Sequence, residues 1–297
     1  MTIYEGYRFV CEALYSIYER REAENVAALV MEKITGLGRM ERMLHKDQIL
    51  PEAEEDRLSH YTTLLLQQQP VQYVVGEAWF YGMPLYVNEH VLIPRPETEE
   101  LVEWVMKDEK NRLQGAGYKG QGTGGSPAIL DIGTGSGCIA MALKKSIPES
   151  DVYAIDVSSK ALAVAQQNAK TQQTAVQFLQ IDFLNAAQTN ALPLFDIIVS
   201  NPPYIPEKDK TDMHKNVLDF EPHAALFVKD NDPLLFYWAI AAFAGQHLQP
   251  DGCVYTEIHE TMGEAVKNIF TQKGFTHTVV RKDMQGKDRM VSAAKTN

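Results

Sequence analysis

LDIGTGSGC, residues 130–138, joins an apolar run to a helical pattern through three closely spaced glycines. Glycine tolerates positive φ and lets the backbone approach a ligand, so the pattern predicts a strand, a tight binding turn and a helix start. The dinucleotide fingerprint G-x-G-x-x-G/A fails here, because Gly137 comes one residue early and Cys138 stands at the last position. Asp131, at the strand end, would also repel a pyrophosphate.

The turn suits a cationic cofactor without phosphates better. Its residues are Gly133, Thr134, Gly135, Ser136 and Gly137. S-adenosylmethionine carries a sulfonium and an amino acid end, so the carboxylate of Asp131 beside the turn becomes favourable. Asp156 ends the next predicted strand and is placed to accept the ribose hydroxyls. Asp182 and Phe183 end the third strand, where they would hold the adenine amino group and ring. The alternative is a glycine turn that binds no nucleotide.

The tetrad Asn201-Pro202-Pro203-Tyr204 follows a fourth predicted strand, the apolar run at 195–200. Ligands of open doubly wound sheets bind outside the carboxyl ends of the strands, so the tetrad should face the methyl group of the cofactor. The side-chain oxygen of Asn201 and a neighbouring carbonyl would each accept one N–H of a planar NH₂ group. The prolines fix these acceptors in advance, and Tyr204 would pack flat on the substrate. The alternative is a Pro-Pro turn that caps a strand.

Strands and helices alternate through the second part of the chain, which predicts an α/β fold with a mainly parallel sheet and helices on both faces. The pattern predicts an α/β fold with a seven-stranded mixed sheet, plus a small helical bundle. The expected domains are a helical bundle at 1–70, a β-hairpin connector at 71–93 and the Rossmann-like domain at 94–297, with a glycine-rich loop at 114–127. The seven strands are expected at 128–131, 152–156, 176–180, 195–200, 253–257, 276–281 and 289–293.

The composition is acidic, with 28 Lys+Arg against 39 Asp+Glu and a formal net charge of −11. Proteins that bind nucleic acid through its phosphates carry a basic face, so the charge favours a protein or small-molecule substrate and no direct nucleic-acid binding. The three cysteines and eight histidines form no disulfide or metal-binding pattern. No secretory signal or membrane span is expected, and a cytoplasmic monomer fits the sequence.

Asn-Pro-Pro-Tyr resembles the tetrad of Rossmann-like S-adenosylmethionine methyltransferases that act on planar NH₂ groups. This resemblance implies that the expected fold is that of a Rossmann-like class I methyltransferase. Four further segments resemble the bacterial peptide chain release factor glutamine methyltransferases, the PrmC/HemK family, and the resemblance covers nearly the whole chain. They are VQYVVGEAWFYG (71–82), VLIPRPETEELV (91–102), FEPHAALF (220–227) and DMQGKDRMV (283–291). The resemblance implies methylation of the side-chain amide nitrogen of the glutamine in the Gly-Gly-Gln motif of class 1 peptide release factors.

The resemblance also implies roles for individual residues. Residues 133–137, Asp156, Phe183 and Asn201 would bind S-adenosylmethionine, residues 201–204 would bind the substrate glutamine, and the helical domain would help to hold the release factor. The sequence departs from the family pattern in three places: Phe183 replaces a common tryptophan, the glycine-rich stretch at 114–127 is long, and His259 replaces a usual glycine.

Three questions stay open at the level of sequence. Arg95 is a candidate substrate-binding residue, a partner for the cofactor carboxylate, or a structural anchor for the hairpin. A methyltransferase for exocyclic amines of RNA or DNA would use the same tetrad. A non-catalytic S-adenosylmethionine-binding partner protein would keep the same turn, although both Asn201 and Asp131 are present.

Overall fold

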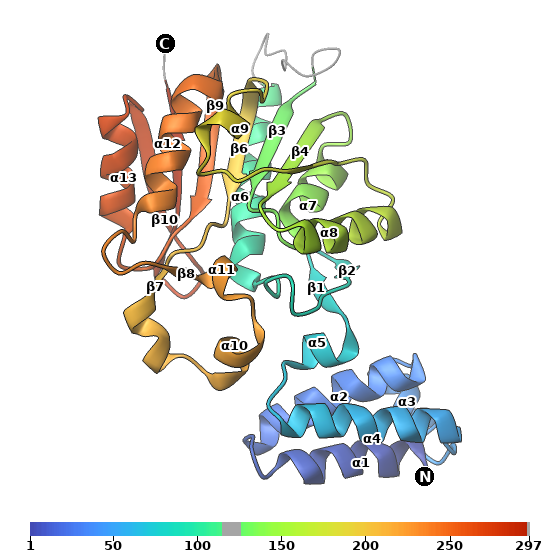
Figure 1. Ribbon diagram of the computed structural model, residues 1–297. Coiled ribbons are helices and arrows are strands. Elements are labelled where there is room, and N and C mark those ends of the chain that lie inside the picture. Colours follow the sequence, from blue (N-terminus) through green and yellow to red (C-terminus); the bar gives the residue numbers. More distant parts are fainter. Residues whose placement is uncertain (115–125, 296–297) are drawn as a thin grey trace. The chain divides into compact units, whose positions relative to one another are not determined.

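The computed structural model describes residues 1–114 and 126–295 (Figure 1). The chain forms two compact units. The first consists of Met1–Glu77 with Met213–Phe220, and the second of Ala78–Asp212 with Glu221–Asn297. No helix among the described residues is long and apolar enough to cross a membrane.

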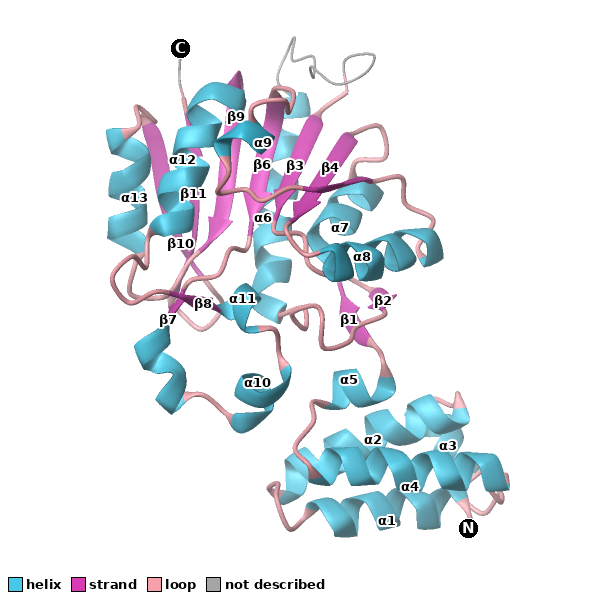
Figure 2. Ribbon diagram, viewed as in Figure 1, coloured by secondary structure: helices cyan, strands magenta, loops and turns pink. Residues whose placement is uncertain are grey.

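The first unit is helical (Figure 2). Its helices are α1 (Ile3–Leu14), α2 (Arg20–Thr35), α3 (Arg39–Leu44), α4 (Glu52–Leu66), α5 (Val71–Val75) and α10 (Lys215–Phe220). Local sequence sets their ends: Thr2 and Glu5 form a capping box before α1, and Gly36 ends α2 in the left-handed conformation. The apolar faces of α1, α2 and α4 meet in one buried cluster that includes Leu14, Met31 and Leu58.

The β-hairpin connector predicted at 71–93 begins with a helix, and its hairpin is confined to Ala78–Leu85. Residues Val71–Val75 form a helical turn, because Pro70 precedes it and Gly76 closes it at φ 67°. These end signals outweigh the strand propensity of the β-branched residues Val71, Val74 and Val75. The hairpin itself is short and consists of β1 (Ala78–Phe80) and β2 (Met83–Leu85), with Tyr81 and Gly82 at positive φ in the turn.

The second unit contains the seven-stranded mixed sheet that the sequence predicts. The strand order is β10-β11-β9-β6-β3-β4-β5. Strand β11 runs opposite to the other six, which are all parallel to one another. The strands are β3 (Ala128–Ile132), β4 (Asp151–Asp156), β5 (Gln177–Gln180), β6 (Phe195–Ser200), β9 (Leu248–Glu257), β10 (His277–Lys282) and β11 (Asp288–Ala294).

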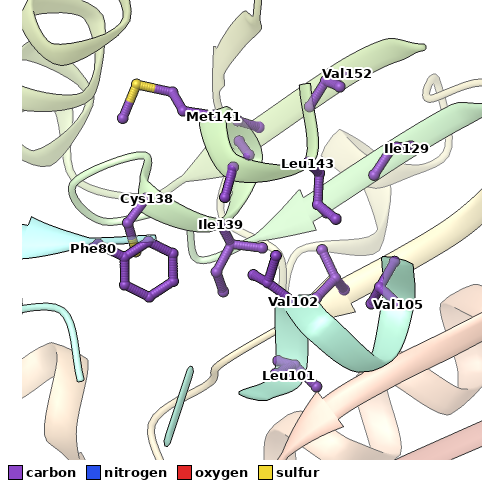
Figure 3. Packing of buried hydrophobic residues seen from close by; sticks show 14 of the residues in the cluster. Phe80, Leu101, Val102, Val105, Ile129, Cys138, Ile139, Met141, Leu143 and Val152 are labelled. Carbon is purple, nitrogen blue, oxygen red and sulfur yellow. The ribbon is translucent and has the colours of Figure 1, made fainter. Parts of the chain in front are cut away.

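Helices cover both faces of this sheet (Figure 1). Successive residues of β3 point to opposite faces of the sheet, so Ile129 belongs to one buried cluster and Leu130 to the other. Figure 3 shows the first layer, where side chains of α6 (Pro96–Gln114) and α7 (Cys138–Ser146) pack together over β3. The second layer contains α12 (Leu235–His247) and α13 (Gly263–Gln272).

Short elements complete this unit around the sheet. They are α9 (Ala186–Thr189), β7 (Ile205–Pro206), the 3-10 turn Glu207–Asp212, α11 (His223–Leu226) and β8 (Phe227–Val228). The longer helix α8 (Ser159–Thr171) packs against β4 and β5. The predicted glycine-rich loop at 114–127 lies largely outside the described residues.

Leu143→Ala tests the packing of the first layer. The Leu143 side chain is fully buried beside α6, so its truncation should lower the free energy of unfolding by about 2–5 kcal/mol. Urea denaturation followed by circular dichroism measures the change. Gln166→Ala, on the exposed face of α8, is the control and should leave the stability nearly unchanged. Equal midpoints for both variants would contradict the packing described.

Candidate active site

The glycine turn between β3 and α7 has the backbone that its sequence predicts. Gly133, Gly135 and Gly137 lie at φ 72°, 54° and 82°, a region that side-chain-bearing residues rarely adopt. A Cβ on Gly133 or Gly135 would meet no atom within 4 Å, so both border open space. A Cβ on Gly137 would lie 3.2 Å from the Cβ of Ala165 on α8. The first two glycines therefore leave room for a ligand, and the third permits close helix packing.

Asp131 is fully buried at the end of β3. Its Oδ2 accepts hydrogen bonds from the hydroxyl of Thr134 at 2.6 Å and from the amide of Ala140 at 3.2 Å, whereas Oδ1 has no hydrogen-bond partner among the described residues. Burial raises the pKa of this carboxyl to about 7, and the nearby charge of Asp156 adds to the rise. A buried oxygen without a donor is costly, which is typical of a position that receives a ligand.

Asp156 ends β4 and holds the glycine turn in place. Its Oδ2 accepts the amide of Gly135 at 2.9 Å, and its Oδ1 accepts the amide of Ser158 at 2.9 Å. Burial raises the pKa of this carboxyl, and the backbone amides oppose that rise. Each carboxylate oxygen has two acceptor sites, so it can take more than one donor.

Asp182 and Phe183, which the sequence places at the end of the third strand, lie just beyond it, because β5 ends at Gln180. Asp182 is exposed and accepts the amide of Leu184 at 3.0 Å. The ring of Phe183 meets the edge of Phe243 on α12, with the ring centres 5.4 Å apart. Among the described residues, Phe243 is the only aromatic ring that contacts Phe183.

The tetrad leaves the sheet beside the glycine turn. Strands β3 and β6 are parallel neighbours with Ile132 opposite Ser200, and the Ser200 hydroxyl donates to the Ile132 carbonyl at 2.9 Å. The glycine turn and Asn201 therefore emerge from adjacent strands at one edge of the sheet. Pro202 is buried, while Asn201, Pro203 and Tyr204 are partly exposed.

Two side chains from distant parts of the sequence hold the tetrad. The carboxamide nitrogen of Asn201 donates to Thr98 Oγ1 at 3.1 Å, and the Thr98 hydroxyl donates to Glu257 Oε2 at 2.7 Å. The Tyr204 hydroxyl donates to Glu257 Oε1 at 2.8 Å. Burial raises the pKa of Glu257, whereas these two hydroxyls and the charge of Arg289 lower it.

Arg95 pairs with Glu221, whose side chain is buried. The other oxygen of Glu221 accepts the amide of Ile93 at 3.2 Å. The guanidinium group is thus held by the segment that precedes α11, which favours the anchoring alternative for Arg95.

His259 is the third departure from the family pattern. Its ring makes a T-shaped contact with the ring of Tyr204, and its Nδ1 lies 2.9 Å from the Thr261 hydroxyl.

The sequence did not identify Thr98, Glu257, Glu221 or Asn168 as part of this region. Thr98 and Glu221 lie within segments that carry the family resemblance, whereas Glu257 lies in the predicted strand at 253–257. Their partners are far away in the sequence, so no spacing reveals the pairs. Asn168 on α8 accepts the amide of Tyr86 at 2.7 Å and donates to the carbonyl of Ser136 at 3.0 Å, which ties the glycine turn to the segment after β2. In the described part of the chain, no group of three or more His, Cys, Asp or Glu side chains is placed to hold a metal ion.

Comparison with known proteins assigns the chain to a family. Residues 12–76 match the model of the PrmC N-terminal domain, and residues 123–226 match the methyltransferase small domain. The release factor glutamine methyltransferase of Flavobacterium psychrophilum is 44% identical over 94% of each chain. The chain belongs to the release factor glutamine methyltransferase family. The corresponding protein of Bacteroides thetaiotaomicron is 37% identical over 96% of this chain and 97% of that one.

Family membership confirms the resemblance that the sequence motifs predict, and it makes this chain a methyltransferase. Among solved structures, the hMettl16 catalytic domain in complex with the MAT2A 3'UTR hairpin 6 has a TM-score of 0.55 at 13% identity, with 83% of each chain covered. This likeness supports the fold alone, and the Rossmann-like fold class predicted for the release factor glutamine methyltransferase domain is confirmed.

Asp131→Asn tests the burial of the carboxyl beside the glycine turn. The folded-state pKa of about 7 lies above the reference value of 3.8, so folding favours the protonated form. The contribution of Asp131 to stability is therefore fully present below pH 3.8 and is lost as pH rises through about 7. The neutral variant lacks this loss and should gain stability relative to the wild type from pH 4 to pH 8. Urea unfolding across that range measures the difference, and parallel curves would contradict it.

Proposed function

We propose that this chain transfers the methyl group of S-adenosylmethionine to the side-chain amide nitrogen of the glutamine in the Gly-Gly-Gln motif of class 1 peptide chain release factors. The observation that carries the proposal is the adjacency of two features at one sheet edge: the open glycine turn after β3 and the carboxamide of Asn201 after β6. The names of the relatives at 37–44% identity support the same substrate.

The residues at the glycine turn fit S-adenosylmethionine. Gly133 and Gly135 leave space for a ligand against the backbone, and the unpartnered Oδ1 of Asp131 suits a cationic group better than a phosphate. Asp156 would accept the ribose hydroxyls, while Asp182 and the ring of Phe183 would hold the adenine. When bound, the cofactor supplies an electrophilic methyl group on a sulfonium.

Asn201 is the group that would orient the glutamine. An amide nitrogen is a weak nucleophile because its lone pair is delocalised into the carbonyl. Oδ1 of Asn201 and the main-chain carbonyl of Pro202 would each accept one N–H of the substrate amide, which aims the nitrogen and favours the positive charge that develops on it. The prolines hold these acceptors in place before the substrate arrives, and the ring of Tyr204 would pack against the planar amide. Arg95, which Glu221 already engages, would support this region from outside rather than touch the substrate.

The helical unit would hold the release factor. On α3, Met40, Met43 and Leu44 are 65–81% exposed, and Arg39 and Lys46 lie beside a cavity of about 350 Å³ that Met43 also lines. An apolar surface with basic neighbours on a chain of net charge −11 suits a protein partner with an acidic and apolar face.

A methyltransferase for exocyclic amines of RNA or DNA is the second candidate, because the same acceptors would grip an aryl NH₂ group. The net charge of −11 weighs against a polyanionic substrate. A non-catalytic binding protein is a weaker alternative still, since Asn201 and Asp131 are both present and Asn201 lies at the sheet edge beside the turn.

Incubation with S-adenosylmethionine labelled on its methyl group tests the substrate. The purified class 1 release factor, total RNA and duplex DNA are offered separately, and mass spectrometry locates the label. We expect the label on the glutamine of the Gly-Gly-Gln motif and none on nucleic acid. A release factor in which that glutamine is replaced by alanine is the control. Label on RNA or DNA instead of protein would refute the proposed substrate.

Asn201→Ala should lower kcat, whereas Asp156→Ala should lower the affinity for the cofactor. Loss of Asn201 removes an acceptor that acts on the nucleophile, so kcat should fall about 10²–10³-fold with nearly unchanged affinity for the cofactor. Loss of Asp156 removes charge-assisted hydrogen bonds to the ribose, so cofactor affinity should fall about 10–100-fold. Steady-state kinetics and calorimetry separate the two effects. Glu149→Ala, an equal charge change in the loop before β4, should leave both values unchanged. Full turnover by Asn201→Ala would contradict its assigned role.

A further inference from the structure

A chain of hydrogen bonds leads from the tetrad into the core of the second unit. It begins at the Asn201 carboxamide, passes through the hydroxyl of Thr98 in the first turn of α6, and ends at the carboxylate of Glu257 in β9. Thr98 is 3% exposed and Glu257 is 1% exposed. Neither side chain is required by the proposed contacts to the cofactor or the substrate amide.

The chemistry of these three groups fixes the direction of every bond. A carboxylate only accepts, so the Thr98 hydroxyl must use its single proton on Glu257. The Thr98 oxygen can then only accept from Asn201, and the carboxamide must turn its NH₂ side toward Thr98. The Oδ1 atom is consequently left on the opposite side of the same carboxamide. A free asparagine has no such preference, because its two ends are nearly equal in size and shape.

We propose that Thr98 and Glu257 are positioning residues that set which end of the Asn201 carboxamide is presented to the substrate amide, an inference that rests on the proposed function. With Oδ1 presented, Asn201 accepts an N–H of the glutamine. With the carboxamide rotated by half a turn, NH₂ would face NH₂, and two donors would repel each other. The orientation is thus a condition for gripping the nucleophile.

Glu257 is itself held in place, which makes the orientation a property of the fold. Tyr204 donates its hydroxyl to Glu257 Oε1, and Tyr237 on α12 donates its hydroxyl to the Glu257 main-chain carbonyl at 3.2 Å. With Thr98 on Oε2 and Tyr204 on Oε1, both oxygens of the carboxylate are occupied by hydroxyl donors. The ring of Tyr204 and the carboxamide of Asn201 share one buried anchor, so the two side chains of the tetrad that would touch the substrate are fixed together.

Thr98→Val and Thr98→Ser form the central test. Valine has nearly the shape of threonine but neither donates nor accepts, so kcat for release-factor methylation should fall about 10-fold with little change in KM for the release factor or in cofactor affinity. Serine keeps the hydroxyl and should restore most of kcat. Thr278→Val, the same chemical change on edge strand β10, is the matched control and should match the wild type. Thr98→Ala also lacks the hydroxyl and should behave as Thr98→Val does, which guards against a packing artefact of valine.

A second measurement reads the carboxamide directly and needs no methyl transfer. In protein labelled with ¹⁵N at asparagine side chains, the Asn201 NH₂ signal is identified by its loss in Asn201→Ala. It should shift in Thr98→Val and Thr98→Ala, and stay in place in Thr98→Ser and Thr278→Val. An unmoved signal in Thr98→Val, or wild-type kcat in that variant, overturns the inference. If the wild type methylates no release factor, the proposed function fails, and the NH₂ signal still decides whether Thr98 orients Asn201.

Discussion

Parallel pairing of β3 with β6 is the interaction on which the site depends. It places Ile132 opposite Ser200, so the glycine turn and Asn201 begin at the same edge of the sheet. The Ser200 hydroxyl locks that register by donating to the Ile132 carbonyl. A slip by one residue would reverse the faces of every side chain on the strand and move the buried Ile198 out of its layer. The register of the core and the geometry of the site are therefore the same constraint.

The site gathers buried carboxylates, and burial opposes their charged form. Asp131 keeps an oxygen with no partner, and burial raises the pKa of Asp131, Asp156 and Glu257 alike. Buried acids of this kind destabilise a protein unless donors surround them. Asp156 and Glu257 receive such donors from backbone amides or hydroxyls, whereas Asp131 Oδ1 does not. The uncompensated oxygen belongs to the residue two positions before Gly133, the first glycine of the turn.

Local signals in the sequence were sufficient for the features that are local in space. Glycines at 133, 135 and 137 require positive φ, and an acid at the tip of the neighbouring strand follows from the βαβ rhythm, so the turn and Asp156 could be predicted. The seven strands followed from alternation in the same way. The helix at Val71–Val75 was missed because two end signals, Pro70 and Gly76, outweigh the propensity of the residues between them.

The contacts that orient the tetrad could not be read from the sequence, because Thr98 and Glu257 lie 159 residues apart. Their pairing follows only once α6 covers the sheet next to β9. The two prolines fix the backbone of the tetrad, but they leave the side chain of Asn201 free to rotate by half a turn. Backbone stiffness alone is therefore insufficient for a residue whose two ends differ only in the direction of hydrogen bonding. A buried carboxylate removes that freedom, since it allows only one order of protons from Glu257 through Thr98 to Asn201.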